Sequence, residues 1–151
     1  GWGTDDAQAR MDNLINSYYA DGKTKLDVVL SPNDSLALGI ANSLKAAGFT
    51  LDNWPIITGQ DCDIPNTINL IQGYQAMSVF KDTRTLAERT VKMASQILNG
   101  EEVEVNNTTD YDNGVKIVPS YLCDPVVVDK SNYKEMLIDS GYYTEDQITV
   151  K

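Results

Sequence analysis

Short apolar runs alternate with amphipathic stretches over the first hundred residues. The apolar runs are brief and rich in Val and Ile, which predicts strands at 26–30, 55–58 and 76–80. Between and around them, apolar residues recur at helical spacing and a glycine closes three of the patterns, which predicts helices from Thr4 onward and at 33–47, 64–71 and 83–98. This β–α alternation predicts an α/β fold with a three-layer, mostly parallel sheet.

The pattern changes after Gly100. Residues 101–114 are acidic and amide-rich with almost no apolar positions, which is typical of an exposed loop. Two further strands are predicted at 115–118 and 125–128, and short helices at 131–138 and 144–148.

Asn33 and Asp61 each follow a predicted strand directly. The carboxyl ends of parallel strands meet at one edge of a sheet, where open α/β folds bind small ligands. In an arbitrary α/β domain, helix capping is the more common explanation for both residues. The functional alternative is recognition of a neutral polyol, because a carboxylate accepts from two hydroxyls and an amide both donates and accepts.

Composition narrows the choice of partners. The formal charge of −10 disfavours nucleic acid, which needs clustered Lys and Arg. Histidine is absent, so the most common metal ligand and general base are missing, and we expect no metal and no cofactor. Cys62 and Cys123 fit no zinc spacing; free thiols are favoured over a disulfide between them.

Other motifs are weak. The stretch DYDNG at 110–114 is one residue short of a calcium loop, and an Asn-Gly turn explains it better. A phosphate-binding glycine loop and a nucleophile elbow are both absent from the sequence. Acid–base chemistry on a sugar would depend only on Asp61, Asp63 and Asp82, so no catalytic residue is assigned.

Several longer segments carry a family resemblance. The segments LSPNDSLALG (30–39) and ITGQD (57–61) resemble the distal half of type I periplasmic sugar-binding proteins, the ribose/galactose-binding family. A more specific similarity, to the ChvE-like branch that binds multiple monosaccharides, lies in AQARMDNL (7–14), FKDTRTLAE (80–88), DNGVKIVPSYL (112–122) and NYKEMLIDSGYY (132–143). The resemblance covers essentially the whole chain.

This resemblance implies a function and a ligand set. The chain would be part of the solute-binding component of a bacterial ABC importer, outside the cytoplasm in the periplasm or as a surface lipoprotein. It would bind a monosaccharide such as glucose, galactose, arabinose or xylose, pass it to the permease, and catalyse nothing. By position, Trp2 matches the residue that stacks on the sugar, Asn33 and Asp61 match polar ligand-binding residues, and Lys81 falls where another polar contact is expected.

The resemblance also implies a division of the chain, because family members are about twice as long and have two lobes. Residues 1–82 would belong to the C-terminal lobe, and residues 83–114 would form a crossover helix and loop that pack on the missing N-terminal lobe. Residues 115–151 would form the return strands and the C-terminal helix. The apolar stripe of the crossover helix then needs that lobe or a second copy as its partner. We therefore expect this chain alone to bind monosaccharides weakly or not at all.

Two other function classes are weighed. The same fold serves as the effector-binding lobe of sugar-responsive transcription regulators, and this is the runner-up. The ending VDKSNYK (128–134) resembles the transporter receptors instead. A sugar hydrolase or isomerase is the third class.

Overall fold

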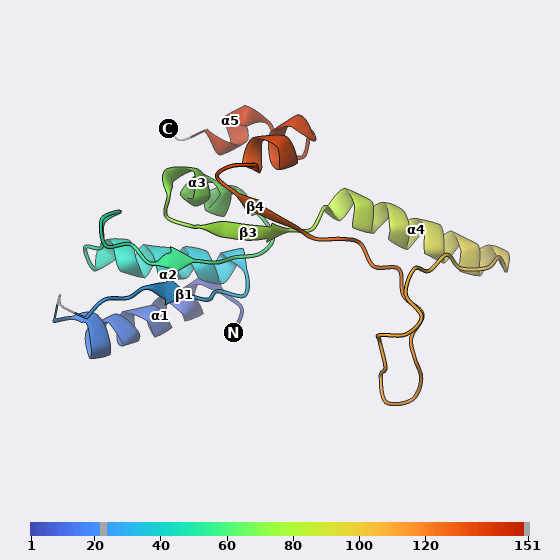
Figure 1. Cartoon of the computed structure of the whole chain (residues 1–151), viewed down its shortest axis with the longest axis horizontal. Helices are drawn as coiled ribbons and strands as arrows, with labels where there is room; N and C mark the ends of the chain where they lie inside the picture. The colour runs from blue at the N-terminus through green and yellow to red at the C-terminus, as the bar shows by residue number, and fades with distance from the viewer. Residues whose placement is uncertain (22–23, 150–151) are drawn as a thin grey trace. The chain divides into compact units, whose positions relative to one another are not determined.

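The computed structural model describes residues 1–21 and 24–149 (Figure 1). The chain divides into two compact units: unit 1 comprises Gly1–Phe80 and Val127–Lys151, and unit 2 comprises Lys81–Val126. Within the described ranges, no helix has the length and apolar character needed to cross a membrane.

The elements follow the predicted alternation. In chain order they are α1 (Thr4–Leu14), a π-helical turn η1 (Ile15–Tyr19), β1 (Val28–Val29), α2 (Asp34–Ala46), β2 (Ile56–Ile57), α3 (Ile64–Gln72), β3 (Met77–Phe80), α4 (Thr83–Asn99), β4 (Val126–Asp129), a second π-helical turn η2 (Lys134–Asp139) and α5 (Glu145–Ile148). The predicted α/β class is confirmed, although the strands are shorter than their apolar runs.

Parallel pairing joins the strands of unit 1. Strand β1 pairs with β2 in parallel, with Val28 opposite Ile56. Beyond β2, an isolated parallel bridge joins Gln60 to Val79 of β3, and β3 pairs in turn with β4. Strand β4 enters from the end at which β3 leaves, so these two run antiparallel (Figure 1). The sheet is therefore mostly parallel, as predicted, with one antiparallel edge strand.

Two apolar clusters form the core of unit 1. The first lies between α1, α2 and β2 and contains Met11, Ile40, Leu44 and Ile57, among others. The second comprises Cys62, Leu70, Phe80, Val128 and Leu137. Each cluster buries the apolar stripe of a helix against a strand, which is how a small α/β unit obtains its stability.

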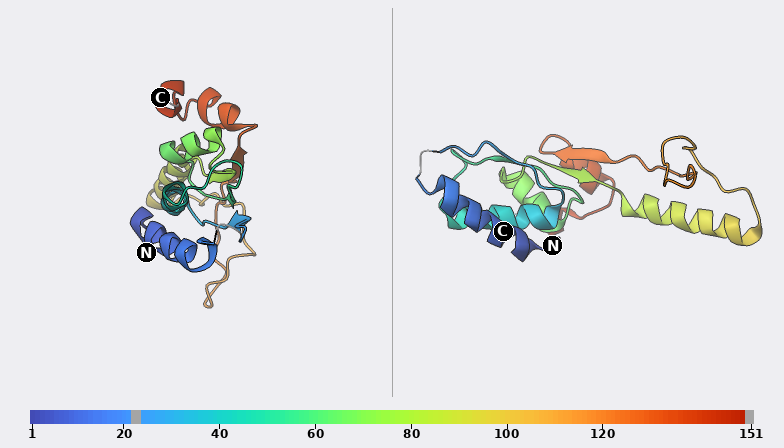
Figure 2. Two further views of the ribbon diagram at one scale, coloured as in Figure 1. Left: turned by 90° about the vertical axis from the view of Figure 1, so that its left-hand side faces the viewer. Right: turned by 90° about the horizontal axis from the view of Figure 1, so that it is seen from below.

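Helices α1, α2 and α3 lie on one side of the strands of unit 1 (Figure 2). On the opposite side, Val28, Ile56 and Val127 remain about half exposed. The described part of unit 1 thus contributes one helical layer and the sheet, and the second helical layer of the predicted three-layer arrangement is not seen there. The alternation of buried and exposed strand residues records the same asymmetry.

Unit 2 consists of α4 and a long loop. Helix α4 begins after Asp82, whose carboxylate accepts from the Arg84 backbone N–H at 2.9 Å, and it ends at Gly100, which has φ +68°. None of its residues is buried, and Val91, Ile97 and Leu98 are well exposed. The apolar stripe predicted for this helix therefore has no cover within unit 2.

The strand predicted at 115–118 is wrong. The side-chain oxygen of Asn113 accepts from the backbone N–H groups of Val115 and Lys116, both at 3.0 Å, so these groups are not available to a β ladder. Isolated bridges join Asp112 to Ile117 and Asn107 to Ser120 instead. A β-branched run is not sufficient for a strand when a turn residue takes its donors.

The packing of α2 leads to a stability prediction. Leu44 is fully buried in the first cluster, so Leu44→Ala is expected to lower the free energy of unfolding by about 3 kcal/mol. Leu30→Ala is the matched control, because Leu30 is 80% exposed and should cost less than about 0.5 kcal/mol. Urea denaturation followed by circular dichroism measures both, and equal losses would contradict the assigned core.

Candidate functional site

The segments that follow β1 and β2 are joined by a backbone hydrogen bond. The N–H of Asp34 donates to the carbonyl of Gln60 at 2.8 Å. Asn33 and Asp61 are the chain neighbours of these two residues, so the structure brings their backbones to one edge of the sheet in unit 1. The hydroxyl of Thr58 also joins these two segments, because it accepts from the Ser31 N–H and donates to the Ser31 carbonyl.

Asn33 caps helix α2. Its side-chain oxygen accepts from the backbone N–H of Leu36 at 3.0 Å, and its carbonyl accepts from the Ser31 hydroxyl at 2.9 Å. The predicted capping role is therefore real. Among the described residues the amide nitrogen of Asn33 has no hydrogen-bond partner, and the residue is half-buried. The Asn33 side chain thus caps α2 through its oxygen and retains its amide N–H groups as hydrogen-bond donors.

Asp61 lies in a strained turn. Its φ is +107° and that of Cys62 is +55°, and these are the two non-glycine residues with positive φ among those described. Such conformations cost about 1–3 kcal/mol each and persist only where the surroundings hold them. Here the Asp61 N–H donates to the Val79 carbonyl, and the Cys62 carbonyl accepts from the hydroxyls of Thr67 and Tyr143.

A fully buried carboxylate lies behind this turn. Asp34 accepts from the backbone N–H of Asp63 at 2.8 Å, the side-chain amide of Gln75 at 2.8 Å and the hydroxyl of Ser78 at 2.9 Å. The amide of Asn66 donates to both the Asp34 carbonyl and the Gln75 side-chain oxygen at 2.8 Å. None of the buried side-chain nitrogen or oxygen atoms in the described residues lacks a partner.

The protonation of these groups follows from their burial. Burial raises the pKa of Asp34 to about 6, while hydrogen bonds from Gln75, Ser78 and Asp63 pull it down. At neutral pH the group is therefore largely ionised, which matches its three donors. Burial and then the charge of Asp61 raise the pKa of Asp63.

Trp2 lies at the start of α1. The chain begins at the end of unit 1 where the strands have their carboxyl ends (Figure 1). The indole of Trp2 is 70% exposed. An exposed aromatic ring at this end of unit 1 suits stacking on a ligand ring.

Lys81 is the first residue of unit 2 and is half-buried. It lines a cavity of about 160 Å³ with Asp82, Leu86 and Cys123. Within unit 2, Asp82 is occupied by Arg84, whose guanidinium donates to the carboxylate at 2.7 Å, and this hydrogen bond lowers the pKa of Asp82. Asp82, one of the three carboxylates that acid–base chemistry on a sugar would need, is thus engaged in an ion pair with Arg84.

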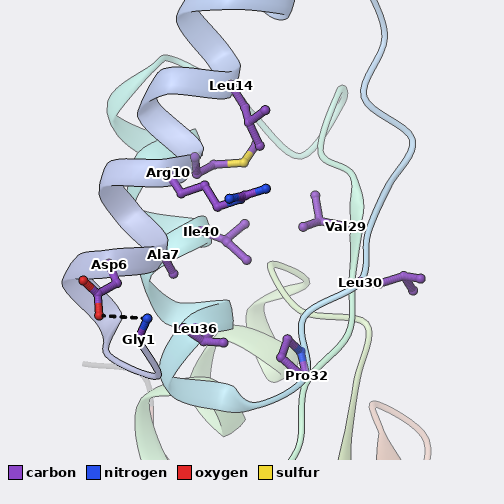
Figure 3. A pocket seen from close by; sticks show the side chains of 11 residues that line it. Gly1, Asp6, Ala7, Arg10, Leu14, Val29, Leu30, Pro32, Leu36 and Ile40 are labelled. Atoms are coloured by element: carbon purple, nitrogen blue, oxygen red, sulfur yellow. Dashed lines mark ion pairs between the residues drawn. The ribbon is translucent and has the colours of Figure 1, made fainter.

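A cavity of about 590 Å³ lies between α1, α2 and β1 (Figure 3). Figure 3 shows Ala7, Val29 and Ile40 around it and Arg10 extending into it. Its lining is mainly apolar, and its polar groups include Asp6, which pairs with the terminal amino group at 3.7 Å. Neither Asn33 nor Asp61 lines it, so it differs from the strand-end site and does not suit a polyol.

Sequence reasoning missed the buried network. The sequence alone assigns no role to Asp34, Gln75, Ser78 or Asn66. All four are polar residues inside or beside apolar elements, at positions that the fold buries. In residues 1–21 and 24–149, no group of three or more Cys, Asp or Glu side chains could hold a metal ion.

Thiol reactivity provides a test of the turn. Both cysteines are free; Cys62 is buried, and burial raises its pKa to about 12, whereas Cys123 is partly exposed. At pH 8 an aromatic disulfide reagent is expected to label Cys123 and leave Cys62 unreacted. Cys123→Ser should abolish native labelling and retain one thiol in urea, and fast native labelling of that variant would contradict the described packing.

Comparisons with known proteins identify the class. The model of the periplasmic binding protein domain family matches residues 1–102, and the chain belongs to this family. It is 50% identical over 149 residues to the multiple sugar-binding periplasmic receptor ChvE of Rhizobium radiobacter, covering 97% of this chain and 42% of the receptor. The predicted resemblance is confirmed.

Solved structures agree with this placement. An ABC transporter solute-binding protein from Clostridium phytofermentans with bound β-D-glucose is 62% identical, with a TM-score of 0.91, and the match covers 99% of this chain and 45% of that one. A carbohydrate transporter solute-binding protein from Chloroflexus aurantiacus in complex with D-glucose is 35% identical, with a TM-score of 0.82 over 95% and 41% of the two chains. This chain therefore spans less than half the length of these relatives.

Proposed function

We propose that residues 1–151 form part of the solute-binding component of a bacterial ABC importer and contribute one wall of a monosaccharide site. The observation that carries this proposal is the strand-end pair, Asn33 and Asp61, held at one edge of the sheet by the Asp34–Gln60 hydrogen bond. Family membership and glucose-bound neighbours support it. The complete solute-binding component binds its ligand and does not transform it.

Each proposed contact has a chemical role. The Asp61 carboxylate accepts from two adjacent sugar hydroxyls, and the Asn33 amide nitrogen donates to a hydroxyl or ring oxygen. Trp2 offers its exposed ring to the apolar face of the sugar. Lys81 is proposed as a further donor on the ground of the family resemblance alone.

The proposed organisation keeps three segments. Residues 1–82 form the C-terminal lobe. Residues 83–114 pack on the N-terminal lobe of the family fold or on a second copy of the chain, and residues 115–151 form the return strands and the C-terminal helix. The exposed apolar residues of α4 support this arrangement, because an uncovered stripe is unfavourable in water. The protein acts outside the cytoplasm, in the periplasm or anchored as a lipoprotein, and passes its sugar to the permease.

Calorimetry tests this proposal. The 151-residue chain is expected to bind D-glucose, D-galactose, L-arabinose and D-xylose with Kd weaker than about 1 mM, because it holds one wall of the site. A chimera in which residues 1–151 replace the matching segment of the Clostridium phytofermentans protein restores the remaining length and should bind at least one of these sugars with Kd on the order of micromolar.

The chimera carrying Asn33→Ala is the control, since it removes one proposed contact and should weaken binding about tenfold. Micromolar binding by the 151-residue chain would contradict the half-site. A folded chimera that binds none of the four sugars would overturn the proposed function.

A further inference from the structure

We propose that Asp34 is a positioning residue of the sugar site, whose buried carboxylate fixes the turn that presents Asp61. This inference rests on the proposed function. Asp34 itself is fully buried, so it does not contact the sugar and acts through its neighbours.

The contacts of Asp34 tie together four segments of unit 1. Its backbone belongs to the start of α2, directly after Asn33, and its N–H donates to the Gln60 carbonyl. Its carboxylate receives the Asp63 N–H at 2.8 Å from the start of α3, the Gln75 amide at 2.8 Å from the loop before β3, and the Ser78 hydroxyl at 2.9 Å from β3. One side chain therefore sets the spacing of the segments that surround the site.

Two anchors of the strained turn depend on this carboxylate. The Asp63 N–H donates to it directly, and the Cys62 N–H donates to the Ser78 hydroxyl at 3.1 Å, which in turn donates to Asp34. These are the residues that follow Asp61, whose φ of +107° requires external support. Removing the carboxylate frees the turn to relax, and the Asp61 side chain then loses its fixed direction.

A burial argument favours a role in function. Among the described residues, the printed donors to the Asp34 carboxylate are the Asp63 backbone N–H, the Gln75 amide and the Ser78 hydroxyl, and all three are neutral groups. A buried carboxylate without a cationic partner is unfavourable unless dipoles compensate it. Buried carboxylates of this kind are found at functional sites as well as in structural networks, so the geometry of the turn decides between the two roles.

The first test uses the sugar affinity of the chimera defined above. Asp34→Asn keeps the shape and turns one acceptor into a donor that faces other donors, and it should weaken binding about 30-fold while the far-ultraviolet circular dichroism stays native. Leu44→Ala is the matched control, because it also destabilises unit 1 but lies outside the network, and its affinity should change less than about threefold. In an Asp61→Asn background, Asp34→Asn should add less than about threefold, since it acts through Asp61.

The second test uses the 151-residue chain without sugar. Amide hydrogen exchange of Cys62 and Asp63, relative to Leu70 of α3, should speed up about tenfold in Asp34→Asn and stay unchanged in Leu44→Ala. An unchanged ratio, or wild-type affinity in the Asp34→Asn chimera, would overturn this inference alone. A wild-type chimera that binds no sugar would overturn the proposed function and with it the role of Asp34 in binding.

Discussion

Replacing Gly59 by alanine is expected to lower the free energy of unfolding by about 4 kcal/mol. A Cβ on Gly59 would lie 2.1 Å from the Asp34 side-chain oxygen and 2.3 Å from the Gln75 amide nitrogen. Both atoms are buried and hydrogen-bonded to each other. The added methyl group must therefore break the network, leaving buried donors and a buried charge without partners.

Gly3→Ala provides the control for this substitution. A Cβ there meets the Asp6 carboxylate at 3.5 Å, an ordinary contact, and the Gly3 backbone has φ −89°, which alanine adopts freely. Its cost should stay below about 1 kcal/mol. Urea denaturation of both variants gives the comparison, and a Gly59→Ala variant as stable as Gly3→Ala would mean that the network has room to move.

The contrast between Gly59 and the strand ends shows what a sequence reveals about this fold. Strand and helix positions in unit 1 follow from apolar periodicity, and the meeting of Asn33 and Asp61 follows from parallel strands ending at one edge. These features depend on local pattern and on a general rule of sheet topology. They were therefore within reach of the sequence alone.

The network of Asp34, Gln75 and Ser78 was not within reach, because it depends on long-range contacts between residues more than forty positions apart. A polar residue at the start of a helix is usually a cap, so Asp34 offers no distinctive local pattern. The same limit explains the wrong strand at 115–118, where the Asn113 side chain competes for backbone donors. Local strand propensity does not decide the structure where a side-chain acceptor binds the backbone N–H groups that a β ladder would need.

Asp61→Gly is expected to change stability and sugar binding in opposite directions. Glycine adopts φ near +107° without the steric cost that Asp61 bears. Glycine also increases the entropy of the unfolded chain, which offsets part of this gain. The free energy of unfolding should therefore rise by about 1 kcal/mol. The same substitution removes the carboxylate proposed to hold two sugar hydroxyls. Affinity in the chimera should fall about 1,000-fold, equivalent to about 4 kcal/mol for two charge-assisted hydrogen bonds.

Asp61→Asn separates the two effects, because it removes the charge and retains a side chain at the strained position. It should leave the free energy of unfolding within about 0.5 kcal/mol of the wild type and weaken sugar binding about 100-fold. Urea denaturation of the 151-residue chain and calorimetry on the chimera measure the two quantities independently. If Asp61 served only the structure, replacing it would lower the free energy of unfolding. A more stable Asp61→Gly variant that binds no sugar would therefore show that the strain in this turn is maintained for the ligand. A less stable variant with intact binding would contradict this role.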